Sequence, residues 1–252
     1  MKRIRLLTYN IHKGIGGRDR RYDLGRIVGV IETIDPDLVC LQEVDSHVRR
    51  SALDDQPALL AERLGFHALF QLNVPVGSSG GYGNLILSRW PLEISRQHSL
   101  RIGRRKPRGL QIARIATPHG SMALANWHLG LTHAEQVRQA RIFLQHSHEP
   151  MWHDLPMIVA GDTNDWGNRL LRKTLALGGF WQASLPVVRC RSFPAWMPVA
   201  SLDKVFVRQG VSRVQAHVPR FRLARVASDH LPLVADFEIA DSRESTGQPG
   251  LE

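Results

Sequence analysis

The 252-residue sequence has little cysteine, no long apolar run and no segment typical of a signal peptide. Its two cysteines, Cys40 in the apolar run DLVCLQ and Cys190 in a distant loop-like stretch, imply neither a disulfide framework nor a cysteine metal site. No run of apolar residues is long enough for a transmembrane helix, and the N-terminus lacks a hydrophobic region followed by a cleavage site. We therefore expect a soluble, cytoplasmic protein.

The composition is that of a globular protein with one large core. Hydrophobic residues make up 43% of the chain, and no linker-like stretch divides it into two parts. We expect one domain over residues 1–240. Residues 241–252 are polar and contain glycine and proline, so we expect a disordered tail there.

Positive charge is in excess and is concentrated locally. The net charge is +10, and the segment 101–109 (RIGRRKPRG) contains Arg104, Arg105 and Arg108, while RFRLAR at 220–225 adds three arginines. Such patches attract polyanions, either nucleic acid or an anionic phospholipid surface. A solvated basic face explains the charge as well, so charge alone gives only a class of partner.

Short apolar segments separated by turn residues dominate the chain. They predict strands at 3–9, 37–42, 67–72, 83–88, 92–98, 110–117, 121–127, 156–161, 203–208, 212–218 and 231–238. Helices are predicted from Leu24 to before Pro36, at 57–64, from Thr132 to about residue 146, and near 168–177. The glycine-rich stretch 77–81 is predicted to be a flexible loop. Many strands with few helices favour an α/β fold of two packed sheets with helices on the outer faces.

Polar side chains recur where the predicted strands begin or end. They are Asn10, His12, Glu43, Asn126, His128, Asp162, Asn164, Asp203, Asp229 and His230. Turn chemistry accounts for each one singly, but it does not require so many strands to end in carboxylate, amide or imidazole groups. If the strands form two facing sheets, these groups gather at one edge. Oxygen-rich groups without cysteine suit a hard cation such as Mg²⁺ or Mn²⁺.

Two other segments of the sequence contain residues that bind metals in other proteins. A calcium loop starting at Asp162 fails, because its fifth and twelfth positions are Trp166 and Lys173, which lack the required oxygen. His146, His148 and His153 are close in sequence and could bind a transition metal, but a solvated face accounts for them better.

Seven segments together resemble the endonuclease/exonuclease/phosphatase superfamily. They are TYNIH, LQEV, GNLILSR, NWHLG, GDTND, LDKVFV and SDHLPL, in the order and spacing typical of that superfamily, from about residue 3 to 238. The resemblance implies a DNase I-like four-layer α/β/β/α sandwich with its active site at one edge. It also implies metal-dependent hydrolysis of a phosphoester bond.

The resemblance also implies roles for individual residues. Glu43 is the principal metal ligand, with Asn10 near the metal and Asp229 as an outer ligand. Asp162 and Asn164 face the scissile phosphate, where Asp162 orients or deprotonates the attacking water. Asp203 fixes the tautomer of His230, and His230 and His128 contact phosphate oxygens or act as base and acid. The residues expected to bind substrate are His12, Asn84, Asn126, Arg104, Arg105 and Arg108.

One position departs from part of the superfamily. His12 stands where apurinic endonucleases carry aspartate, which weakens a two-carboxylate metal site and argues against that activity. Nucleic acid is our first expectation for the substrate, because the basic segment 101–109 precedes a strand that leads toward the catalytic edge.

Two alternatives to a nuclease are also compatible with the sequence. One is hydrolysis of a phospholipid or another small phosphoester, for which FPAWMPV at 193–199 offers apolar side chains. The other is a catalytically inactive polyanion-binding module, although the joint presence of the expected catalytic groups speaks against it. No obligate protein partner is inferred.

Overall fold

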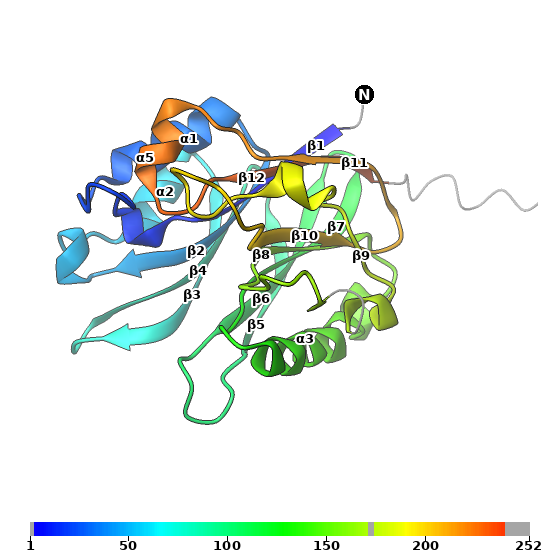
Figure 1. Cartoon of the computed structure of the whole chain (residues 1–252). Coiled ribbons are helices and arrows are strands. Elements are labelled where there is room, and N and C mark those ends of the chain that lie inside the picture. The colour runs from blue at the N-terminus through cyan, green and yellow to red at the C-terminus, as the bar shows by residue number, and fades with distance from the viewer. Residues whose placement is uncertain (1–2, 171–173, 240–252) are drawn as a thin grey trace, which may run out of the picture.

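The computed structural model describes residues 3–170 and 174–239 (Figure 1). Two six-stranded sheets face each other, with strand orders β11-β12-β1-β2-β4-β3 and β5-β6-β7-β8-β10-β9. The strands are β1 (Arg3–Asn10), β2 (Leu38–Ser46), β3 (His67–Val76), β4 (Gly80–Ser88), β5 (Leu92–Ser99), β6 (Gly109–Thr117), β7 (Gly120–His128), β8 (Met157–Asp162), β9 (Trp181–Gln182), β10 (Asp203–Val207), β11 (Val211–His217) and β12 (Leu233–Ile239). The α-helices are α1 (Leu24–Ile34), α2 (Gln56–Leu64), α3 (His133–Ser147) and α5 (Arg222–Ala227).

Helices cover the outer faces of both sheets. Figure 1 shows α1, α2 and α5 on one side of the molecule and α3 on the other, which gives the predicted four-layer α/β/β/α sandwich. Short 3-10 helices lie in the connections: η1 (His12–Gly14), η2 (Arg49–Ser51), η3 (Pro150–Trp152), η4 (Leu175–Gly178) and η5 (Val187–Cys190). None of the helices in the described ranges is long and apolar enough to cross a membrane.

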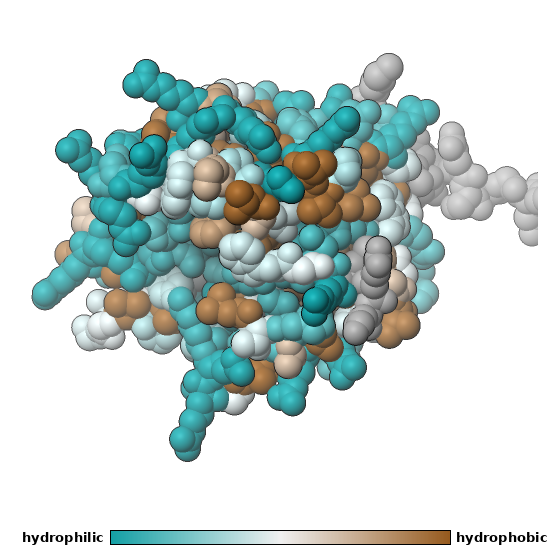
Figure 2. All heavy atoms as spheres, viewed as in Figure 1, coloured by the Kyte–Doolittle hydropathy of each residue, from teal (hydrophilic) through white to brown (hydrophobic). Residues whose placement is uncertain are grey.

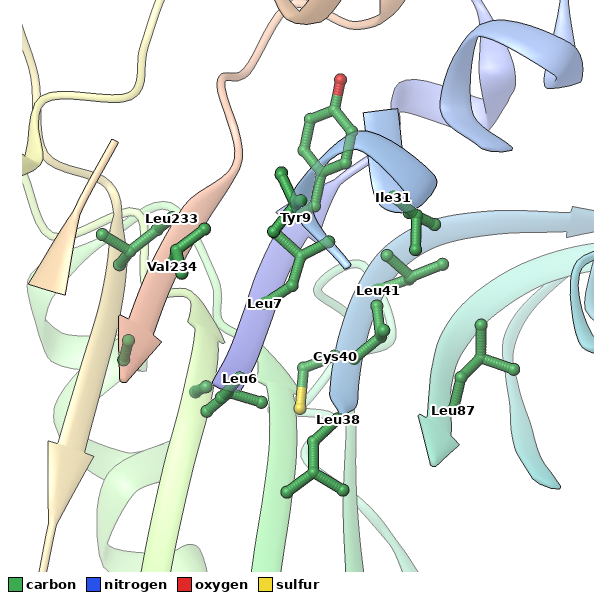
Figure 3. Packing of buried hydrophobic residues seen from close by; sticks show 14 of the residues in the cluster. Leu6, Leu7, Tyr9, Ile31, Leu38, Cys40, Leu41, Leu87, Leu233 and Val234 are labelled. Atoms are coloured by element: carbon green, nitrogen blue, oxygen red, sulfur yellow. The ribbon is translucent and has the colours of Figure 1, made fainter. Parts of the chain in front are cut away.

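Successive side chains of the central strands point to opposite faces of each sheet, so each strand contributes to two layers of hydrophobic core. On β7, Met122 and Leu124 pack into the core that includes the space between the sheets, whereas Ala123, Ala125 and Trp127 pack under α3. In Figure 3 Leu6 and Cys40 point away from α1, while Tyr9 and Leu41 lie on its side. Cys40 is fully buried, as predicted, and both cysteines are free.

Several predicted boundaries were wrong. β2 continues to Ser46 rather than ending at residue 42, and β3 and β4 extend to form a long hairpin that includes Gly80 and Gly81 of the predicted flexible loop. Helix α5 was not predicted, because it is only six residues long and overlaps the basic segment 220–225. The helix predicted near 168–177 lies partly outside the described residues, and the tail predicted at 241–252 lies wholly outside them.

Candidate active site

Asp162 lies at the centre of a buried polar cluster at the end of β8. Its Oδ2 accepts a hydrogen bond from Asn10 Nδ2 at 3.1 Å and lies 3.4 Å from His128 Nε2 and 3.8 Å from His230 Nε2. Its Oδ1 accepts a hydrogen bond from the backbone N–H of Asn164 at 2.9 Å. Burial raises the pKa of Asp162, although the nearby His230 opposes the rise, so the carboxylate is a stronger base than an exposed aspartate.

The sheet pairing brings these residues together. Asn10 ends β1 in one sheet, whereas His128 and Asp162 end the parallel neighbours β7 and β8 of the other sheet. Asp203 begins β10 and pairs with Asp162 across the antiparallel ladder. Because parallel strands present their carboxyl ends at the same edge, the sequence positions of these residues translate directly into one site.

Gly161 has a specific part in this arrangement. Its φ is +145°, and a Cβ at this position would lie 2.0 Å from the carbonyl oxygen of Trp127. Only glycine fits there, so β8 can approach β7 closely just before Asp162.

His230 is held by two carboxylates. Its Nδ1 lies 2.8 Å from Asp203 Oδ2, and the Ser192 hydroxyl donates a hydrogen bond to the same oxygen. Burial lowers the pKa of His230, but Asp203 and Asp162 outweigh this effect and raise the pKa to about 10. The ring is therefore an imidazolium at neutral pH.

His128 is in the opposite state. Burial lowers its pKa well below the usual value, and the positive charge of Arg108 lowers it further. The site thus holds one neutral and one charged imidazole beside the same oxygen of Asp162, which is the condition for distinct roles in acid-base chemistry.

The charge on His230 gives a testable pH dependence. A histidine whose folded-state pKa is raised contributes stability that is complete below its unfolded pKa, near 6.5, and is lost as the pH rises through about 10. In EDTA, the free energy of unfolding of the wild-type protein should fall more steeply between these values than that of His230→Gln. Urea titrations at several pH values measure this, and parallel curves for the two proteins would contradict the raised pKa.

Glu43 lies within a strand and not at its exit. It is the extra residue of a β-bulge in β2, between Gln42 and Val44, with φ of 58°. The bulge turns its side chain out of the regular alternation. The carboxylate pairs with the ammonium of Lys13. Burial opposes its ionisation, but Lys13 and His12 hold its pKa well below the usual range.

His12 contacts Asn10 and lies near Asp229. The side chain of Asp229 is 27% exposed, and its Oδ1 lies 4.0 Å from His12 Nδ1. The backbone N–H of His12 donates to Asn10 Oδ1 at 3.1 Å, and the Ser228 hydroxyl donates to the Asn10 carbonyl at 2.7 Å. His12 thus stays within the site as a neighbour of an acid.

The oxygen atoms of Glu43, Asn10 and Asp229 are suitable ligands for a hard divalent cation. Glu43 and Asp229 offer carboxylate oxygens and Asn10 an amide oxygen, which are the ligands that Mg²⁺ and Mn²⁺ prefer. The ammonium of Lys13 at the Glu43 carboxylate shows that this carboxylate already attracts a cation.

A second group of metal-ligating side chains lies elsewhere. His98, His146 and Glu149 have ligand atoms within 4.8 Å of one another. However, the two imidazoles are stacked nearly parallel, with centroids 3.5 Å apart. The lone pairs of ring nitrogens lie in the ring planes, so parallel rings do not converge on one ion. The sequence analysis predicted a solvated face for His146. The structure instead places His146 half-buried against His98 and Glu149.

Two amides expected to bind substrate are not brought to the open edge. Asn126 is fully buried between the sheets, where its Nδ2 donates to the carbonyls of Leu41 and Leu85 and its Oδ1 accepts from Gln42 at 2.9 Å. Asn84 is 1% exposed and donates to the Gly109 carbonyl at 3.0 Å. Both join strands of different sheets, so their predicted contact with substrate has no support in this arrangement.

The basic segment divides into an outer and an inner part. Arg104 and Arg105 are exposed in the connection between β5 and β6, and Arg105 lies 3.5 Å from Glu135. Arg108 is 7% exposed and close enough to His128 to lower its pKa, as is Lys106. Lys106 also lies over the Tyr82 ring at 5.1 Å.

Lys204 is a site residue that the sequence analysis missed. It is fully buried, and its Nζ donates to Thr163 Oγ1 at 3.1 Å, to the Asp165 carbonyl at 2.9 Å and to the Ser201 carbonyl at 2.7 Å. Burial lowers its pKa to about 8. Lys204 ties the turn after Asp162 to the start of β10. A charged residue on an apolar strand was the only signal that pointed to it.

The two-sheet sandwich and its edge of carboxylates, imidazoles and amides are typical of proteins that hydrolyse phosphoester bonds. The model of the Endonuclease/Exonuclease/phosphatase family matches residues 7–230. The chain belongs to this family, whose members generally hydrolyse phosphoester bonds.

Similar proteins cover almost the whole chain. "Uncharacterized protein YbhP" of Escherichia coli K12 is 29% identical over 249 residues, which is 93% of this chain and 96% of that protein. An endonuclease/exonuclease/phosphatase from Beutenbergia cavernae has a TM-score of 0.75 and 24% identity, over 95% of this chain and 72% of that one.

Two further structures share the fold. The mannosyl-6-phosphatase Bt3783 of Bacteroides thetaiotaomicron has a TM-score of 0.70 and 16% identity, over 93% of this chain and 99% of that one. Truncated TDP2 of Caenorhabditis elegans has a TM-score of 0.69 and 18% identity, over 94% and 98% of the two chains.

Proposed function

We propose that this protein is a divalent-metal-dependent phosphodiesterase that acts on nucleic acid. The observation that carries the proposal is the His230–Asp203 pair, which faces Asp162 across 3.8 Å at the same edge as Glu43. A purely structural cluster has no need of two imidazoles held in opposite charge states around a buried carboxylate.

The residues of the chain divide the chemistry among them. Asp162, with its raised pKa, accepts the proton of the attacking water. His230, held as an imidazolium, donates Nε2–H to a phosphate oxygen as negative charge builds up there. Asn164 donates one amide hydrogen to the Leu129 carbonyl at 3.0 Å, which leaves the other for the phosphate.

Glu43, Asn10 and Asp229 would hold a Mg²⁺ or Mn²⁺ ion. When bound, such an ion neutralises the phosphate oxygens and stabilises the charge of the transition state. Neutral His128, whose Nε2 lies 3.4 Å from Asp162 Oδ2, would donate a hydrogen bond to a phosphate oxygen. Lys13 must share the Glu43 carboxylate with the ion, which tunes how strongly this carboxylate binds it.

The preference for nucleic acid rests on charge close to the site. Lys106 and Arg108 extend positive charge from His128 toward the exposed Arg104 and Arg105, and the whole chain carries a net charge of +10. A polynucleotide places further phosphates on both sides of the reacting one, so it gains from such an extension. A small phosphomonoester gains little.

A phospholipid or another small phosphoester is the second candidate. Trp196, Met197 and Val199 are 42%, 63% and 53% exposed on the 193–199 loop. Figure 2 shows hydrophobic residues, in brown, grouped over the segment drawn in yellow in Figure 1. Those apolar side chains favour a contact with lipid. The mannosyl-6-phosphatase among the structural neighbours shows that the fold also carries phosphatase activity in that protein.

A panel of substrates tests the proposal. The purified protein, with Mg²⁺ or Mn²⁺, should hydrolyse bis-p-nitrophenyl phosphate and at least one of single-stranded DNA, double-stranded DNA and RNA, in preference to phospholipids and inositol phosphates. Asp162→Asn serves as the inactive control. Turnover of lipid or sugar phosphates alone would replace nucleic acid by the second candidate, and inactivity on every phosphoester would favour a binding module.

A further inference from the structure

A hollow of about 430 Å³ lies outside the catalytic cluster and is lined by arginines. Its lining residues are Arg18, Trp196, Arg220, Arg222, Arg225 and Val226, which we call the arginine pocket. The volume is that of a site for a nucleotide-sized group. Neither the catalytic chemistry nor the fold requires this pocket.

Local structure turns these side chains toward one place. Arg222 and Arg225 are three residues apart on α5, so they share a face of the helix. Arg220 precedes the helix, and Arg18 comes from the loop before α1, the helix that packs against α5. Trp196 closes the pocket from the 193–199 loop.

The charge of the pocket is unbalanced. Among the described residues, no carboxylate lies within 4.0 Å of any of its four guanidinium groups, whereas Arg26 on the adjacent α1 pairs with Asp19 and Asp23. Four exposed cations around one hollow repel one another, and a bound polyanion relieves that repulsion. Arginine is also the side chain best shaped for phosphate, because its fork donates two parallel hydrogen bonds.

The pocket is attached to the catalytic edge through Asp229. The N–H of Ala195, next to Trp196, donates to the Asp229 carbonyl at 2.7 Å. Gly17, next to Arg18, packs directly on Asp229, because a Cβ at Gly17 would lie 2.6 Å from the Asp229 Cα. Two walls of the pocket are therefore neighbours of a residue of the candidate metal site.

We propose that the arginine pocket binds a segment of single-stranded nucleic acid next to the nucleotide that reacts at Asp162. This rests on the function proposed above. The guanidinium groups take the backbone phosphates, and the indole of Trp196, 42% exposed, stacks on a base. The pocket is concave, which fits a chain segment better than the plane of a bilayer. A nucleic acid thus contacts basic groups on both sides of the reacting phosphate, at Arg108 and at Arg222.

Binding measurements on inactive protein test the pocket. In the Asp162→Asn background, fluorescence anisotropy with a short labelled oligothymidylate measures affinity at several salt concentrations. Arg222→Ala/Arg225→Ala should weaken binding by about tenfold or more and reduce the slope of log affinity against log salt by about 1.4, or about 0.7 for each lost phosphate contact. Trp196→Ala should weaken binding several-fold without changing that slope, because stacking releases no counterions.

A matched pair of arginines supplies the control. Arg138 and Arg141 are exposed and three residues apart on α3, on the other side of the sandwich. Arg138→Ala/Arg141→Ala removes the same charge and should change affinity less than about twofold. If the two double variants bind equally, the pocket proposal is wrong.

Two further arms separate the outcomes. Loss of binding to phosphatidylserine vesicles by the α5 variant, with oligonucleotide binding unchanged, would overturn nucleic acid as the occupant and point to a membrane surface. Hydrolysis of bis-p-nitrophenyl phosphate by the wild-type protein reports the proposed function separately, because that molecule is too small to reach the pocket. Thermal unfolding of each variant verifies that it is folded.

Discussion

Replacing Glu43 by glutamine is expected to lower metal-dependent phosphoesterase activity by more than about a hundredfold while the protein remains folded. Glutamine keeps the size of the side chain at the bulge in β2 but removes the negative charge that attracts a cation. Glu43 is held ionised by Lys13 and His12, so the wild-type carboxylate needs no proton loss to bind a metal. Initial rates on a small diester at increasing Mg²⁺ or Mn²⁺ concentration measure the effect.

Glu32→Gln is the matched control, because Glu32 is an exposed glutamate on α1. It should behave like the wild-type protein in rate and in metal dependence. EDTA should abolish the activity of both proteins. Wild-type activity that persists undiminished in EDTA would exclude the metal mechanism, whatever the variants show.

The second large effect is expected at the His230–Asp203 pair. His230→Ala should lower kcat by about 10² to 10⁴, the range that one acid-base group supplies. Asp203→Asn should also be severely impaired, because the carboxylate at 2.8 Å fixes the tautomer and the charge of the ring. The double variant should be little worse than His230→Ala, since the two residues act as one unit.

Kinetics of the four proteins on one substrate form a double-mutant cycle. Losses that simply add would contradict the pairing. The pH profile gives an independent readout, because Asp203→Asn removes the largest source of the raised pKa of His230. The alkaline limb of the rate profile, if it reports His230, should then move to lower pH.

The strand ends were the part of the site that sequence could predict. Asn10 and Asp162 end apolar segments, and Asp203 begins one. Because β10 runs antiparallel to β8, its first residue lies beside the last residue of β8, and the facing of the two sheets brings the end of β1 to the same edge. The loop residues Asp229 and His230 precede the last strand and reach the same edge. Their roles remain predictions, but their proximity follows from topology alone.

Long-range pairing hid the rest. Glu43 looked like a strand end because a bulge leaves no mark in hydrophobic alternation. Asn126 also follows an apolar run, but it lies on the same face of β7 as Met122 and Leu124, so its side chain points between the sheets. Alternation along a strand does not show which face of the sheet lies at the open edge. The contact between Lys13 and Glu43 joins η1, which follows β1, to the bulge within β2, and their approach depends on how β1 and β2 are paired.

The amides between the two sheets have a mechanical consequence. The hydrophobic effect that packs two apolar faces together is non-directional, so it specifies their relative register less sharply than hydrogen bonds do. Three buried amides fix the position of one sheet relative to the other, because each makes directional hydrogen bonds to the opposite sheet. They are Gln42, Asn84 and Asn126. Glu43 and Asn10 belong to one sheet, and Asp162 and His128 belong to the other. A shear of one residue would separate the cation-binding half of the site from its proton-transferring half, so these buried amides keep the two halves of the reaction in alignment.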